Sequence, residues 1–165
     1  MNLPNIITVA RILLVPVFVI VYLSPGASTY IVAATLFALA AATDWLDGYL
    51  ARRLNQTTPF GAFLDPVADK LIVVSALVVL LAEHASIWLT LPGLVIVGRE
   101  IVISALREWM AEMNSSVTVA VSYLGKIKTS LQMIAITVLL AMPPSSESPF
   151  MLAAYALLYL AALMT

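Results

Sequence analysis

The chain has 165 residues, of which 62% are hydrophobic and 10% charged, and its formal net charge is −1. A soluble domain cannot hide that much apolar surface, so the composition predicts a membrane protein. The near-zero net charge argues against nucleic-acid binding, and the absence of cysteine excludes a disulfide framework, a thiol nucleophile and a zinc–thiolate site.

Apolar runs separated by short polar, proline-rich or glycine-rich breaks predict an all-α integral membrane protein with six transmembrane helices in a single domain, 1–165. The expected helices cover 5–24, 29–53, 59–82, 86–112, 117–142 and 147–165. The first run has no cleavage site typical of a signal peptide, so we interpret it as a membrane helix.

Local signals mark two of the breaks and the last helix. Pro59 is expected in the first turn of the third helix, with Thr57 or Thr58 as the cap. His84, the only histidine, is expected to be solvated in the join that follows this helix. The sixth run stops at Thr165 without a polar or basic flank, which predicts either a truncated helix or a tail beyond this sequence.

The positive charges predict the orientation of the helices. If six helices alternate, every Lys and Arg lies on, or in the half-membrane nearest, the side that holds the N-terminus, and the opposite joins contain none. These cations are Arg11, Arg52, Arg53, Lys70, Arg99, Arg107, Lys126 and Lys128. The positive-inside rule then places both termini and the charged side in the cytoplasm, for a multi-pass protein of the cell (inner) membrane.

Four aspartates form two pairs on the second and third predicted helices. Asp44 and Asp47 are spaced i, i+3, and Asp65 and Asp69 are spaced i, i+4, so each pair shares one helix face. The short join makes the two helices antiparallel neighbours, and we expect the four carboxylates to converge. Like charges in a low-dielectric setting need protons or cations. Oxygen ligands favour Mg²⁺ or Mn²⁺, as one ion or two.

Small and cationic residues accompany these aspartates. Gly48 lies one turn from Asp44, and Gly61 lies one turn before Asp65. A residue without a side chain on the carboxylate face lets a ligand approach the backbone closely. Arg52 lies two turns beyond Asp44 and can donate to a diphosphate through two N–H groups.

This spacing resembles the signature of the CDP-alcohol phosphotransferase family, D-x2-D-G-x2-A-R, a spacer of eight or nine residues, then G-x3-D-x3-D. Every fixed position is present, namely Asp44, Asp47, Gly48, Ala51, Arg52, Gly61, Asp65 and Asp69. The resemblance implies a six-helix membrane fold, metal ligation by the first three aspartates, and a base, Asp69, that often also ligates metal. It implies CDP contacts from Gly48, Ala51, Arg52 and Gly61. Family members often pair, so it also implies a homodimer.

A second set of cations lies on the fourth and fifth predicted helices. They are Arg99, Arg107, Lys126 and Lys128, our candidate ligands for an acceptor phosphate. A cationic pocket beside a metal–diphosphate site suits an acceptor that carries its own phosphate, which favours glycerol 3-phosphate or an inositol phosphate over free serine, choline or ethanolamine. The strings 98–108 and 125–129, and 2–8 with Arg11, resemble the phosphatidylglycerophosphate synthase branch. That likeness implies transfer from CDP-diacylglycerol, a membrane lipid, to glycerol 3-phosphate with release of CMP.

Alternatives stay open for most of these charges. The aspartates are instead structural if they form ion pairs with Arg52, Arg53 and Lys70. Arg52 is alternatively a snorkelling anchor at a helix end. Arg99 either forms an ion pair with Glu100 or binds substrate.

The roles of the polar residues in the first predicted helix, and the function itself, also have alternative interpretations. Asn5, Thr8 and Arg11 either cap and anchor the first helix or close over the CDP site. Arg107 and Lys128 are alternatively simple positive-inside flanks. The acceptor is alternatively an inositol phosphate or another polar alcohol. Intramembrane carboxylates also occur in cation or proton transporters, a different class of function.

Overall fold

The computed structural model describes residues 3–26, 28–53, 58–113 and 123–164, and at 44–53 and Lys126, among others, it describes the backbone alone. Within these residues every regular element is an α-helix. The helices are α1 (Leu3–Leu23), α2 (Thr29–Arg53), α3 (Pro59–His84), α4 (Ile87–Glu112), α5 (Tyr123–Leu140) and α6 (Pro149–Leu163). The prediction of an all-helical chain with six helices is therefore confirmed for the described part.

The observed helix ends follow local chemistry. α6 begins where the Oγ of Ser148 accepts a hydrogen bond from the N–H of Phe150 at 3.3 Å. α3 continues to His84 and ends at Ala85, which adopts the left-handed conformation with φ 43°. His84 is therefore half-buried in a helix, with Nδ1 3.1 Å from the carbonyl oxygen of Leu80, and its expected place in a solvated join was wrong. The first six residues of the predicted fifth helix, 117–122, lie outside the described residues.

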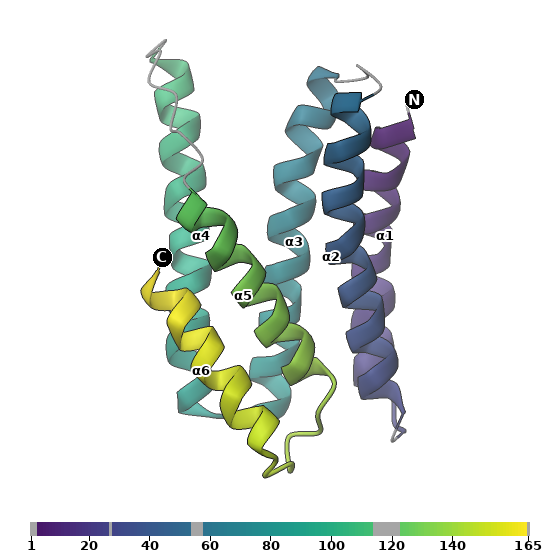
Figure 1. Cartoon of the computed structure of the whole chain (residues 1–165), viewed down its shortest axis with the longest axis vertical. Coiled ribbons are helices and arrows are strands. Elements are labelled where there is room, and N and C mark those ends of the chain that lie inside the picture. Colours follow the sequence, from purple (N-terminus) through teal and green to yellow (C-terminus); the bar gives the residue numbers. More distant parts are fainter. Residues whose placement is uncertain (1–2, 27, 54–57, 114–122, 165) are drawn as a thin grey trace.

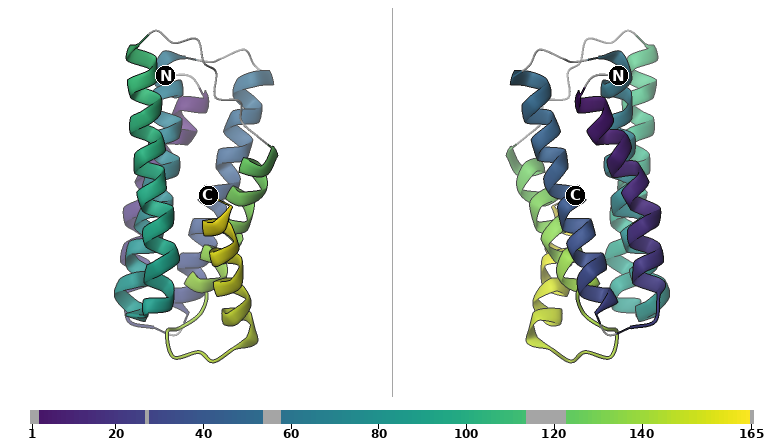
Figure 2. Two further views of the ribbon diagram at one scale, coloured as in Figure 1. Left: turned by 90° about the vertical axis from the view of Figure 1, so that its left-hand side faces the viewer. Right: turned by 90° about the vertical axis from the view of Figure 1, so that its right-hand side faces the viewer.

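The helices pack as two connected groups. α1 lies against α2 and α3, and α5 lies against α6 and α2 (Figures 1 and 2). α4 contacts α3 and α6, so it closes the other side of the molecule. α1 begins, α2 ends, α3 begins and α4 ends at the same end of the molecule, which is the upper end in Figure 1.

The apolar core and the buried polar residues occupy different stretches of the helices. On α1 the buried apolar residues begin at Val15, and the buried polar residues, Asn5, Thr8 and Arg11, come before it. In the core, Phe18 of α1 meets Phe37 of α2 edge-to-face, with ring centroids 6.1 Å apart. Near its start α1 thus contacts α3 through polar side chains, and from Val15 onward its buried residues are apolar.

Two helices have the length and composition of membrane spans, Asn5–Leu23 and Ile87–Met110. Large apolar side chains on their outer faces are exposed, as Leu13, Ile20 and Leu94 illustrate. Exposed apolar faces of this kind suit contact with lipid rather than water. Within the described residues three further helices have shorter apolar segments, Thr29–Thr43, Ile127–Leu140 and Pro149–Leu163. The 15 residues of α6 extend only about 22 Å, against a hydrocarbon core of about 30 Å.

Candidate functional site

A capped turn fixes the start of α3 and with it the position of its polar face. Thr58 is extended, and its Oγ1 accepts a hydrogen bond from the N–H of Gly61 at 3.0 Å. Pro59 occupies the first turn, where a missing N–H costs no helical bond. Thr58, one of the two residues predicted for this role, is therefore the cap.

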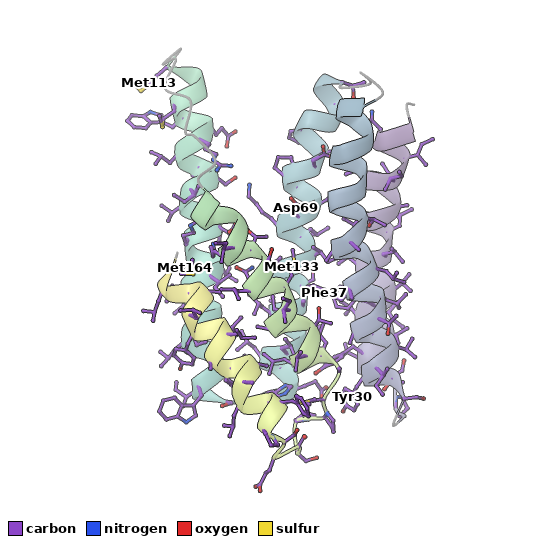
Figure 3. The ribbon with its side chains drawn as sticks, viewed as in Figure 1. Tyr30, Phe37, Asp69, Met113, Met133 and Met164 are labelled. Carbon is purple, nitrogen blue, oxygen red and sulfur yellow. The ribbon has the colours of Figure 1, made fainter. Side chains whose placement is uncertain are left out.

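Asp65 and Asp69, two of the four predicted metal ligands, each accept a hydrogen bond from α1. The hydroxyl of Thr8 donates to Oδ1 of Asp65 at 2.8 Å. The guanidinium of Arg11 donates to Oδ1 of Asp69 at 3.0 Å and forms an ion pair with it. Figure 3 labels Asp69 on α3, which stands between α2 and α4 in that view. From Thr8 to Arg11 and from Asp65 to Asp69 the chain advances by about one turn in the same direction, so α1 and α3 run parallel here.

The ion pair is asymmetric in its exposure. The side chain of Arg11 is 1% exposed, whereas that of Asp69 is 45% exposed. A buried guanidinium is stable only if an anion and hydrogen-bond acceptors surround it. Asp69 provides that anion and still presents nearly half of its side-chain surface outside the contact.

A third contact brings α1 close to the first turn of α3. Nδ2 of Asn5 donates to Oγ1 of Thr58 at 3.0 Å, and Oδ1 of Asn5 lies 3.2 Å from the same hydroxyl. A Cβ added to Gly61 would lie 2.6 Å from Oδ1 of Asn5, closer than real Cβ atoms approach other atoms. Gly61 therefore packs closely against α1, and its contact with CDP stays a prediction.

The α2 half of the signature lies outside the described side chains. The backbone of its residues belongs to α2, and nothing further is described of Asp44, Asp47, Gly48, Ala51 and Arg52. Among the side chains that are described, no three His, Cys, Asp or Glu residues form a group that could hold a metal ion. The convergence of four carboxylates stays a prediction, of which Asp65 and Asp69 are the described half.

Two of the predicted acceptor ligands meet at one carboxylate. Oε1 of Glu100 lies 3.2 Å from Nη1 of Arg99 and 3.5 Å from Nζ of Lys128. The ion pair between Arg99 and Glu100, one of two alternatives, is thus present. Lys128 is buried on α5, so its contact with Glu100 connects α5 to α4. Two cations and one anion give this cluster an excess of one positive charge.

The remaining cations are placed differently. Arg107 is exposed on α4, and the side chain of Lys126 lies outside the described part of the chain. Lys70, which the structural alternative paired with the aspartates, donates to Oγ of Ser104 at 2.6 Å and so joins α3 to α4. Asp69 forms an ion pair with Arg11, which that alternative did not include, and the side chains of Arg52 and Arg53 lie outside the described part of the chain.

Comparison with known proteins identifies the family. The sequence model of the CDP-alcohol phosphatidyltransferase family matches residues 1–165. The chain belongs to the CDP-alcohol phosphatidyltransferase family. It is 58% identical over 146 residues to the CDP-diacylglycerol–glycerol-3-phosphate 3-phosphatidyltransferase of Pseudomonas fluorescens, covering 88% of this chain and 75% of the relative. Proteins of the same name from Salmonella typhimurium and Escherichia coli (strain K12) are 52% and 51% identical over 142 residues, covering 86% of this chain and 78% of each relative.

CDP-alcohol phosphatidyltransferases generally depend on a divalent metal ion, and two of the described residues have side chains of the kind that bind one. Asp65 and Asp69 supply carboxylate oxygens, the ligands that Mg²⁺ and Mn²⁺ prefer. They lie one turn apart on α3, and both are only half-buried, so a metal ion can approach their oxygens. The donor set and its accessibility thus suit a hard cation.

The polar stripe of α1 is the part of the site that the sequence did not resolve. Asn5, Thr8 and Arg11 recur every three residues, which is the signal of a single helix face. We expected this face either to anchor its own helix or to close over CDP. In this CDP-alcohol phosphatidyltransferase it bonds to α3, and two of its members bond to signature aspartates.

Proposed function

We propose that the chain transfers the phosphatidyl group of CDP-diacylglycerol to glycerol 3-phosphate, giving phosphatidylglycerophosphate and CMP. One observation carries the proposal: relatives 51–58% identical over 86–88% of this chain are named for this transfer. The complete family signature, with Asp65 and Asp69 together on one face of α3, supports the same chemistry.

The reaction assigns a role to each signature aspartate. Asp44, Asp47, Asp65 and Asp69 are the proposed ligands of one or two Mg²⁺ or Mn²⁺ ions. When bound, such an ion neutralises the diphosphate and stabilises the departing CMP. Asp69 accepts the proton of the acceptor hydroxyl as that oxygen bonds to the β-phosphorus and the bond from phosphorus to CMP breaks. An ionised carboxylate has about four acceptor sites, so a bond from Arg11 to Oδ1 is compatible with this role.

The proposed CDP contacts are Gly48, Ala51, Arg52 and Gly61. Arg52 can hold the diphosphate through two N–H groups, and the small residues let the nucleotide approach the helix backbone. The position of Gly61 in the first turn of α3, one turn before Asp65, supports its share in this set.

The proposed ligands of the acceptor phosphate are Arg107, Lys126, Arg99 and Lys128. The shared contact of Arg99 and Lys128 with Glu100 supports a site for an anion, because the cluster has more positive than negative charge. A phosphate that approaches these cations compensates the excess, whereas serine or choline offers no comparable charge.

We also propose a multi-pass protein of the inner membrane, with six spans, both termini in the cytoplasm, and a catalytic site that opens to the cytoplasm. The clustering of all cations toward one side supports this orientation. Because the chain has no cysteine, single cysteines report topology cleanly. In spheroplasts, an impermeant maleimide should label Ser145→Cys and should reach Met113→Cys only after permeabilisation. Labelling of Met113→Cys from outside would contradict the orientation.

A CMP-release assay tests the reaction. Purified protein with Mn²⁺ or Mg²⁺ should release CMP from CDP-diacylglycerol when glycerol 3-phosphate is present, and a chelator should stop the release reversibly. A panel with inositol phosphate, serine and water as acceptors separates the candidates. Equal or faster release with inositol phosphate would refute the acceptor assignment. Mass measurement in detergent tests the homodimer that the family resemblance implies.

A further inference from the structure

The two described aspartates of the signature are each held by a donor from another helix. Oδ1 of Asp65 accepts from Thr8 at 2.8 Å, and Oδ1 of Asp69 accepts from Arg11 at 3.0 Å. One fixed oxygen restricts the rotation of a carboxylate about its terminal bond. Each contact therefore narrows the range of directions in which the second oxygen of that aspartate can point.

The donors are far better shielded than the carboxylates that they hold. Thr8 and Arg11 are each 1% exposed, whereas Asp65 and Asp69 are half-buried. Because both donors are buried, water competes for them less than it would at the surface, which strengthens the bonds. The arrangement combines buried donors with carboxylates that keep part of their surface exposed.

The beginning of α1 sets the register of these contacts. Asn5 bonds to Thr58, the cap of α3, and Gly61 leaves room for the Asn5 side chain. Because the two helices run parallel from that point, Thr8 lies opposite Asp65, and Arg11 lies opposite Asp69. The same register that joins the two helices therefore orients both carboxylates.

From this geometry we propose that Thr8 and Arg11 are positioning residues, which orient the carboxylates of Asp65 and Asp69 for binding a divalent metal ion. The inference rests on the proposed function, because that function assigns the metal to these aspartates. Donors that orient metal ligands are expected to change metal affinity by about 10–100-fold when they are removed. A role limited to packing would lower stability without changing the affinity of the folded protein.

Thr8 offers the sharpest test, because valine has nearly the shape of threonine and lacks the hydroxyl. Purified Thr8→Val should bind Mn²⁺ at least about 10-fold more weakly, measured from the paramagnetic resonance signal of free Mn²⁺. Thr8→Ser keeps the hydroxyl and should restore affinity to within about 3-fold. The matched control is Thr137→Val, which removes a half-buried hydroxyl that donates to Met133 of its own helix at 2.8 Å. It should bind Mn²⁺ like the unmodified protein.

The outcomes separate this inference from the proposed reaction. Thr8→Val that folds and binds Mn²⁺ as tightly as the unmodified protein would overturn the positioning role. If Thr8→Val does not fold, the smaller Thr8→Ala carries the same expectation. Unmodified protein that binds Mn²⁺ but releases no CMP would refute the reaction, while weaker binding by Thr8→Val would still support the positioning role. An unmodified protein that does not bind Mn²⁺ would overturn both.

Discussion

The buried guanidinium of Arg11 on α1 lies 3.0 Å from the half-exposed carboxylate of Asp69 on α3. The two residues are 58 positions apart in the sequence, so only the packing of α1 on α3 brings them together. A cation buried at this depth is costly to leave unpaired, and Asp69 is therefore held at α1. The contact ties the most reactive residue of the proposed mechanism to a helix that contributes nothing to the family signature.

Removing the cation should impair turnover more than it impairs folding. Arg11→Met should lower the rate of CMP release about 10–100-fold, because Asp69 loses the donor that orients it. Arg11→Lys keeps the charge but not the planar donor, and should retain an intermediate rate. Lys70→Met removes a cation that is adjacent in sequence and bonds to Ser104, so it should cost far less. Equal losses in Lys70→Met and Arg11→Met would contradict a specific role of Arg11.

Neutralising the proposed base should abolish the reaction. Asp69→Asn keeps the shape of the side chain but cannot accept the proton of the acceptor hydroxyl, so CMP release should fall by at least about 100-fold. Glu108→Gln removes an exposed carboxylate of α4 that lies outside the signature, and its rate should be unchanged. An Asp69→Asn enzyme with normal turnover would refute the base assignment.

The contact between Gly61 and Asn5 predicts a steric effect. Gly61→Ala places a methyl group 2.6 Å from Oδ1 of Asn5, which must break its contact with Thr58 to move away. We expect the free energy of unfolding to fall by about 1–3 kcal/mol, which should be seen as a lower midpoint temperature of thermal unfolding. Asn5→Ala in the same chain should recover part of that loss, since the two effects share one contact.

Gly98→Ala is the matched control for this prediction. An added Cβ there meets no atom within 4 Å, and the residue lies inside α4. Alanine also has the higher helix propensity, so Gly98→Ala should leave stability unchanged or raise it by up to about 1 kcal/mol. If both glycine variants had the same effect, a general helix property rather than the Asn5 contact would explain Gly61.

The acceptor assignment predicts a selective change in substrate affinity. Lys128→Met removes a buried cation beside Glu100 and should raise the KM for glycerol 3-phosphate about 10-fold or more, because charged hydrogen bonds contribute about 1.5–3 kcal/mol. The KM for CDP-diacylglycerol should change little. Arg107 is exposed, so Arg107→Met should have a smaller effect on the same constant. A change in kcat alone for Lys128→Met would argue against phosphate binding.

Much of the fold could be predicted because its signals are local. Apolar runs gave the six helices, and the Pro59 signal placed the start of α3 correctly. The largest local error, at His84, arose because a polar pair does not end a helix whose backbone bonds can continue. The spacing of Asp65 and Asp69 likewise predicted one shared face of α3.

The sequence alone thus determined the helices, the family signature and the chemistry of its carboxylates, since these depend on residue type and on spacing within one helix. Only the tertiary structure decided the partners of those residues. It paired Arg11 with Asp69 and Thr8 with Asp65, set Asn5 against Gly61, and turned Lys70 toward Ser104. The reason is physical: a helix period fixes which residues share a face, whereas the neighbour of that face depends on how all the helices pack.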